Sequence, residues 1–171
     1  MSHRISRFTL LPVAAIALAA CDAGSSSSGA LPTEGTVRLA VVADAAHGGR
    51  PFHQSMTQEV TADPPYAGDP DGVGEATLTI NVGLGEVCWS TTASNITLPA
   101  TASHIHEAPV AVRGPIVIPL TAPDASGHAT GCRTGVERAL LQRILTDPSA
   151  FYVNVHTSDF PAGAIRSQLD R

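Results

Sequence analysis

The sequence contains no lysine, and aromatic residues make up only 4 per cent of its 171 residues. Charged residues account for 15 per cent, and the 15 acidic residues outnumber the 10 basic ones, which gives a formal net charge of −5. This balance argues against a nucleic-acid partner, which needs a basic surface. Since aromatics are scarce, a core has to be built mainly from Val, Ile, Leu and Ala, and the hydrophobic content of 43 per cent is sufficient for one.

Several motifs on which common activities depend are also absent. The sequence has no G-x-S-x-G elbow to expose a nucleophilic serine. Residues 35–171 contain no phosphate-binding glycine loop, no heptad repeat and no apolar stretch long enough to cross a membrane. The lack of a nucleophile elbow argues against a hydrolase.

The first 20 residues have the plan of a secretory signal peptide. Arg4 and Arg7 form a short basic start, and an apolar run follows from Phe8 to Ala20. At about 1.5 Å per residue this run makes roughly 20 Å of helix, which is too short for a bilayer core of about 30 Å. We therefore expect residues 1–20 to be removed on export.

The end of this leader predicts a lipid anchor. The sequence LAAC at residues 18–21 resembles the lipobox that bacterial lipoprotein signal peptidase cleaves just before the cysteine. Lipid on Cys21, followed by the Ser/Gly-rich tether of residues 21–34, would hold a domain of residues 35–171 at the outer face of a membrane, periplasmic or extracellular. The alternative is an ordinary cleaved signal peptide with a chance cysteine.

Two cysteines remain after Cys21 is assigned to lipid. Cys88 and Cys132 are expected to form a disulfide, because exported proteins fold in an oxidising compartment. The alternative is a pair of thiolate metal ligands, which the lack of a C-x-x-C spacing disfavours.

The sequence of residues 35–171 predicts an all-β domain with one helix. Short alternating or apolar stretches, separated by Gly, Pro and Asp turns, predict an antiparallel Greek-key sandwich or barrel. A helix near residues 135–147 is expected to begin with a Thr134–Glu137 capping box and to end before Pro148. The predicted strands are 36–43, 55–62, 75–82, 87–93, 102–107, 115–120, 151–156 and 163–169.

Four blocks of sequence carry a family likeness: ASHIHE at 102–107, GPIV at 114–117, FYVNVHT at 151–157 and FPAGAIRSQL at 160–169. In this order they resemble a CHRD (chordin) domain, and weaker likeness extends the resemblance over roughly residues 36–169. It implies an immunoglobulin-like β fold but little about activity. The chain departs from the family at Ala164, where an acidic residue is usual, and in a lengthened opening, HGGRPFH, at residues 47–53.

Three histidines suggest a metal site. Residues two apart on a strand share one face, so His104 and His106 point together, as do Asn154 and His156. If the two strands are neighbours, three imidazoles converge and could bind copper or zinc. The segment HIHE also looks like a strand of copper/zinc superoxide dismutase, which raises a redox activity as a second hypothesis.

The competing interpretation is structural. His104, His106 and His156 could instead form a buried hydrogen-bond network with Glu59, Asn154 and Arg166, in which a nearby guanidinium would oppose cation binding. The leading hypothesis is therefore a non-enzymatic, lipid-anchored envelope module that binds an unidentified envelope partner. A metal-binding or dismutase-like protein is the alternative.

Overall fold

The computed structural model describes residues 48–62 and 64–171. The predicted leader, the lipid site at Cys21, the tether and the predicted strand 36–43 lie outside these residues. Within the described part of the chain, no helix is both long and apolar enough to cross a membrane.

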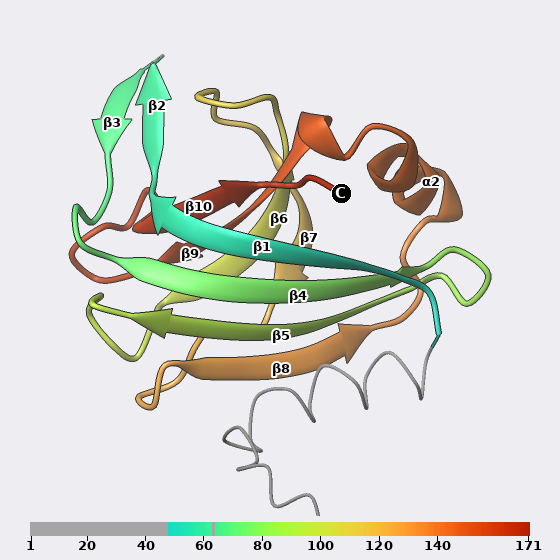
Figure 1. Ribbon diagram of the computed structural model, residues 1–171, viewed down its shortest axis with the longest axis horizontal. Helices are drawn as coiled ribbons and strands as arrows, with labels where there is room; N and C mark the ends of the chain where they lie inside the picture. The colour runs from blue at the N-terminus through green and yellow to red at the C-terminus, as the bar shows by residue number, and fades with distance from the viewer. Residues whose placement is uncertain (1–47, 63) are drawn as a thin grey trace, which may run out of the picture. The chain divides into compact units, whose positions relative to one another are not determined.

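Eight strands form one antiparallel sheet in the order β7-β6-β9-β10-β1-β4-β5-β8, and β2 pairs with β3 in a separate hairpin (Figure 1). The strands are β1 (Arg50–Gln58), β2 (Val60–Ala62), β3 (Pro65–Ala67), β4 (Val73–Asn81), β5 (Glu86–Ser94), β6 (Ala102–Glu107), β7 (Ile116–Leu120), β8 (His128–Arg133), β9 (Phe151–His156) and β10 (Ile165–Gln168). The helices are α2 (Arg138–Thr146) and the short 3-10 helix η1 (Pro148–Ala150).

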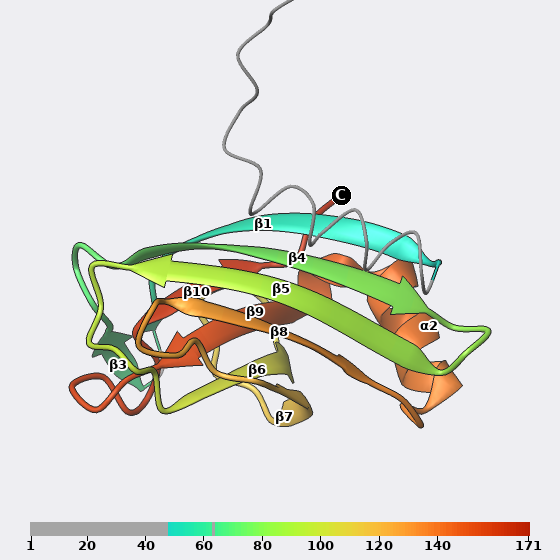
Figure 2. The ribbon, with the colours of Figure 1, turned by 90° about the horizontal axis from the view of Figure 1, so that it is seen from below.

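The sheet curls so that its two halves face each other, with β4, β5 and β8 over β6, β7 and β9 (Figure 2). Alternate residues of each strand point into the space between the halves, where Leu78 and Val87 belong to the same buried cluster as Ile105, Val153 and Val155. The chain crosses between the halves from β5 to β6, from β7 to β8 and, through α2, from β8 to β9. The all-β prediction is therefore confirmed.

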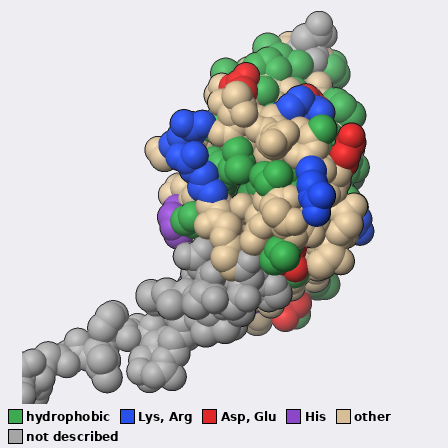
Figure 3. Space-filling model, turned by 90° about the vertical axis from the view of Figure 1, so that its right-hand side faces the viewer, with side chains coloured by type: hydrophobic (Ala, Val, Ile, Leu, Met, Phe, Trp, Pro, Cys, Tyr) green, Lys and Arg blue, Asp and Glu red, His purple; other side chains and the backbone are tan. Residues whose placement is uncertain are grey.

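Helix α2 lies across one end of the sheet, as Figure 1 shows. Its apolar stripe, which includes Leu140, Leu141 and Ile144, is buried against the core. Figure 3 looks at the side of the molecule that carries this end, and there the arginine side chains stand apart among polar and apolar ones. In helix α2, Arg143 pairs with Glu107 of β6 at 2.9 Å.

The predicted Thr134–Glu137 capping box is wrong. Glu137 is itself the residue before the helix, and no side chain caps the helix start. The segment is positioned instead by tertiary contact, because the backbone N–H of Val136 donates to the carbonyl of Gly85 in the β4–β5 turn. Gly135 has φ +71°, which breaks the helix before it can extend back to Thr134.

Several strand boundaries also differ from the prediction. The expected strand 55–62 is two strands separated at Glu59, whose backbone N–H donates to the carbonyl of Ala164. The supposed lengthened opening at 47–53 runs into β1, which starts at Arg50 and buries Phe52. Strands β3 and β8 were not predicted, because PYA is short and HATGCR lacks clear alternation.

The predicted disulfide is confirmed. Cys88 on β5 and Cys132 on β8 are directly opposite each other in the strand register, and their sulfur atoms are bonded. The thiolate alternative is thereby excluded, although Glu86 lies close to both sulfur atoms. The disulfide joins an inner strand of the sheet to its edge.

Candidate functional site

Strands β6 and β9 are neighbours, and their register brings the three histidines together. His104 lies opposite Asn154, His106 opposite Tyr152, and Ala102 opposite His156. Because directly opposite residues share a face, all the side chains of the predicted cluster point away from the apolar core. The cluster therefore lies on the outer face of the sheet.

The imidazoles are close enough to share one ligand. His104 Nδ1 lies 3.2 Å from His156 Nε2, and the ring centroids of His104 and His106 are 5.4 Å apart. One ring nitrogen from each of the three histidines can be chosen so that all lie within 4.8 Å of one another. His106 is buried, whereas His104 and His156 are partly exposed.

Backbone carbonyls fix two of the rings. His106 Nδ1 lies 2.9 Å from the carbonyl oxygen of Gly114, and His156 Nδ1 lies 3.1 Å from that of Pro161. Since a carbonyl only accepts, each Nδ1 carries the proton in a neutral ring, and each Nε2 keeps a free lone pair. His106 Nε2 is buried and has no hydrogen-bond partner among the described residues.

Asn154 links the histidines to a buried carboxylate. Its Nδ2 donates to Glu59 Oε2 at 3.0 Å, which leaves its Oδ1 3.1 Å from His156 Nε2. With the His156 proton on Nδ1, two lone pairs face each other across this gap. A cation or an additional proton between them would relieve the repulsion.

All three imidazoles are held in the neutral form. Burial lowers the pKa of His104 to about 4, and the neighbouring His156 and His106 rings contribute to this shift. Burial also lowers the pKa values of His106 and His156. Neutral imidazole is the form that binds a metal ion, so the cluster is in a ligand-competent state at neutral pH.

Arg166 lies behind Tyr152 rather than among the histidines. Its guanidinium carbon is 3.3 Å from the centroid of the Tyr152 ring, and this ring in turn stacks on His106 with centroids 4.7 Å apart. Strands β6 and β10 flank β9 on opposite sides, so the tyrosine ring separates the positive charge from the imidazoles. The charge of Arg166 still reaches His106, because burial and, in addition, repulsion from Arg166 lower the pKa of that imidazole.

Glu59 and Arg166 do not form a direct ion pair. The guanidinium donates instead to the carbonyls of Pro109 and Val112 and to Gln168 Oε1 at 2.8–2.9 Å. Glu59 is only 1 per cent exposed, and burial raises its pKa, while Arg166 acts on it through longer-range attraction. Glu59, Asn154 and Arg166 thus belong to one buried polar layer, in which Glu59 and Arg166 interact only at longer range.

This polar layer is buried because two segments cover it. The hairpin β2–β3 and the 108–115 loop are joined by a hydrogen bond from the Ala62 N–H to the Ala111 carbonyl. Arg113 from the loop lies over the ring of Tyr66 from the hairpin, 4.6 Å from its centroid. The roles of this cover and of the Gly114 and Pro161 carbonyls could not be predicted from the sequence, since a backbone acceptor has no residue-type signal.

Comparison with known proteins gives one match. The family model described as CHRD domain matches residues 52–169, which is more than half of the chain and includes all three histidines and both bonded cysteines. The match begins later than residue 36, where the resemblance was placed from the sequence. No curated protein and no solved structure matches the chain.

Proposed function

The chain belongs to the CHRD domain family, and we propose that it is a lipid-anchored, extracytoplasmic module that binds a copper or zinc ion without acting as an enzyme. The observation that carries the metal assignment is the set of three neutral imidazoles whose free nitrogens converge on the outer face of the sheet.

The anchor and the location are supported by the leader and by the cysteines. The LAAC sequence ends an apolar leader at Cys21. The remaining two cysteines are bonded to each other, as is usual for proteins outside the cytosol. A Ser/Gly-rich tether would then let the domain stand away from the membrane surface.

Cys21→Ser tests the anchor. We expect the full chain to carry diacylglycerol and to sediment with membranes, and the variant to appear in the soluble fraction, because a serine at this position provides no thiol for the thioether. Mass spectrometry of the N-terminal peptide and fractionation of an expressing bacterium measure this. Membrane association of the variant equal to that of the parent chain would contradict the proposal.

The chemistry of the site favours a borderline or soft transition metal. Three neutral nitrogen donors suit zinc and copper, and Asn154 Oδ1 adds an oxygen beside His156. Hydrogen bonds from His106 and His156 to backbone carbonyls orient the rings, as such bonds do for metal-binding histidines in known sites. The partial exposure of His104 gives an ion a route from solvent.

The structural interpretation makes a different prediction for the same residues. In that account the contacts among His104, His156 and Asn154 only fix the register of β6 and β9. It leaves the buried His106 Nε2 without a partner, at a cost of about 1–3 kcal/mol. A bound cation removes this cost, and the histidines then contribute to affinity as well as to stability.

Metal analysis separates the two accounts. We expect protein purified without chelator to hold or take up one equivalent of copper or zinc, and His104→Ala with His106→Ala to bind at least about a hundredfold more weakly. Elemental analysis and titration with each ion measure this. At about 100 times its Kd the metal should also stabilise the parent chain by about 2.7 kcal/mol.

The matched control is His53→Ala with His128→Ala, which removes two exposed histidines from other strands. This control should still bind one equivalent of copper or zinc. Absence of specific binding by the parent chain, or equal loss of binding in the control, would leave the structural network as the role of the cluster.

A further inference from the structure

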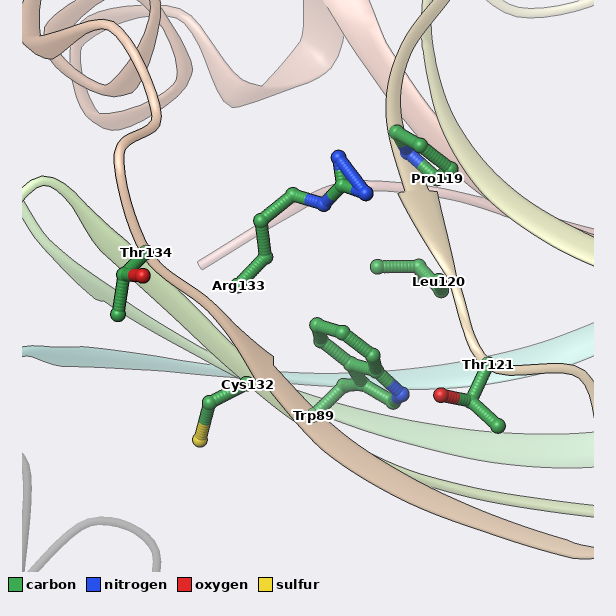
Figure 4. A pocket seen from close by; sticks show the side chains of 7 residues that line it. All are labelled: Trp89, Pro119, Leu120, Thr121, Cys132, Arg133 and Thr134. Atoms are coloured by element: carbon green, nitrogen blue, oxygen red, sulfur yellow. The ribbon is translucent and has the colours of Figure 1, made fainter.

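The curled sheet is open along one seam, between its edge strands β7 and β8. Two hollows of about 560 and 340 Å³ lie along this seam and share Thr121 as a wall. Between them they are lined by five of the six residues of β8 and by residues 119–122 of β7 and its extension, with Asp124, Trp89 and Thr134. The seam is therefore a groove that follows β8 for its whole length, and Figure 4 shows the larger hollow.

The side of β8 that faces this groove has backbone groups available for another strand. The Ala93 N–H donates to the Gly127 carbonyl, which continues the β5–β8 register and marks odd-numbered positions of β8 as those bonded to β5. The N–H and carbonyl groups of Thr130 and Cys132 therefore point into the seam. No strand of the described residues pairs with this edge.

Trp89 provides the floor of the groove. Its side chain lies flat over Gly131, where a Cβ would approach Cζ2 to 2.6 Å, and so reaches across β8 into the seam. The ring lies beside Leu120 with its nitrogen side turned toward Thr121 (Figure 4). Trp89 is 6 per cent exposed, and its buried indole N–H has no partner among the described residues.

We propose that residues 36–43 of this chain, TVRLAVVA, occupy the groove as an additional strand beside β8. Their alternation would place Val37, Leu39 and Val41 on one side, toward Trp89 and Leu120, and Arg38 on the other, toward solvent. The added strand would supply backbone partners for Thr130 and Cys132 and a carbonyl for the indole N–H. Adding a strand to a free sheet edge is a common mode of peptide recognition.

The connection to β1 is long enough for this placement. Arg50 on β1 lies in register with Ile80 on β4, which is in register with Val87 on β5 and, through it, with Arg133 on β8. Arg133 is thus three strand spacings from Arg50, and a strand beyond β8 would be four. At about 4.8 Å per spacing, the position beyond β8 is about 19 Å from Arg50. Residues 43 to 50 span up to about 24 Å when extended. A segment tethered at this distance has a high effective concentration, which favours it over a free peptide.

Amide exchange in the full chain carrying Cys21→Ser tests the proposal without altering the groove. We expect the Thr130 and Cys132 amides to be protected from exchange as strongly as those of Ala129 and Gly131, which are hydrogen-bonded to β5. This protection should be the same at any protein concentration. Exchange at the rate of solvent-exposed amides would overturn the proposal. Protection that appears only at high protein concentration would assign the groove to a second copy and would also overturn it.

Trp89 gives a second readout, because it is the only tryptophan in the chain. Leu39→Asp with Val41→Asp should shift the emission to the red, raise acrylamide quenching and speed Thr130 exchange at least about tenfold, which corresponds to about 1.4 kcal/mol. The matched control Arg38→Ser with Val42→Ser changes the opposite side and should leave all three unchanged. Equal behaviour of the two double variants would contradict the proposed register.

Discussion

Arg166→Met should lower the free energy of unfolding by about 3–6 kcal/mol, because two carbonyls each lose a hydrogen bond to a charged donor at about 1.5–3 kcal/mol. Arg166 is 7 per cent exposed, and its guanidinium satisfies the carbonyls of Pro109 and Val112 while stacking on Tyr152. Methionine fills much of the volume but removes these donors, and it leaves the Glu59 carboxylate without its principal positive neighbour. Urea unfolding at pH 7 measures the loss.

Two control variants make this expectation specific. Arg166→Lys keeps the charge but cannot donate to separate acceptors from a planar fork, so an intermediate loss is expected. Arg138→Met removes an exposed arginine with a hydrogen bond to the Gly83 carbonyl, and a loss below about 1 kcal/mol is expected. If Arg166→Met lowers the free energy of unfolding as little as Arg138→Met does, the buried polar layer contributes little to stability.

The disulfide is expected to contribute nearly as much. Cys88 and Cys132 are 44 residues apart, and closing a loop of this length restricts the unfolded chain by about 4 kcal/mol in the chain-entropy model. Such a loss is a large share of a typical net stability of about 5–15 kcal/mol. Urea unfolding of the Cys21→Ser chain with and without reductant measures it.

The reduced protein needs a control for effects of the reductant itself. Cys88→Ser with Cys132→Ser should unfold at the same urea concentration with or without reductant, and close to the reduced parent chain. Mass spectrometry should also show a gain of two protons in the parent chain on reduction. Equal stability of the oxidised and reduced parent would contradict the expected role of the bond.

The location of strands and of the histidine cluster could be predicted where a local pattern was strong. Strict alternation in ASHIHE and FYVNVHT fixed which residues share a face, and the structure has strands at both positions. The cysteine count gave one pairing once Cys21 was assigned to lipid. The capping box at Thr134 and the boundary at Glu59 were wrong because tertiary hydrogen bonds to Gly85 and Ala164 override the local preference.

Sequence alone thus determined the all-β class, the disulfide and the common face of each histidine pair, since these depend on residue type and on a period of two along a strand. Only the tertiary structure decided that β6 lies beside β9, that the Tyr152 ring lies between His106 and Arg166, and that β8 leaves a seam open. Strand order and burial of an outer face depend on contacts between segments far apart in the chain. No local pattern encodes those contacts, and they determine which ring nitrogens are free to bind an ion.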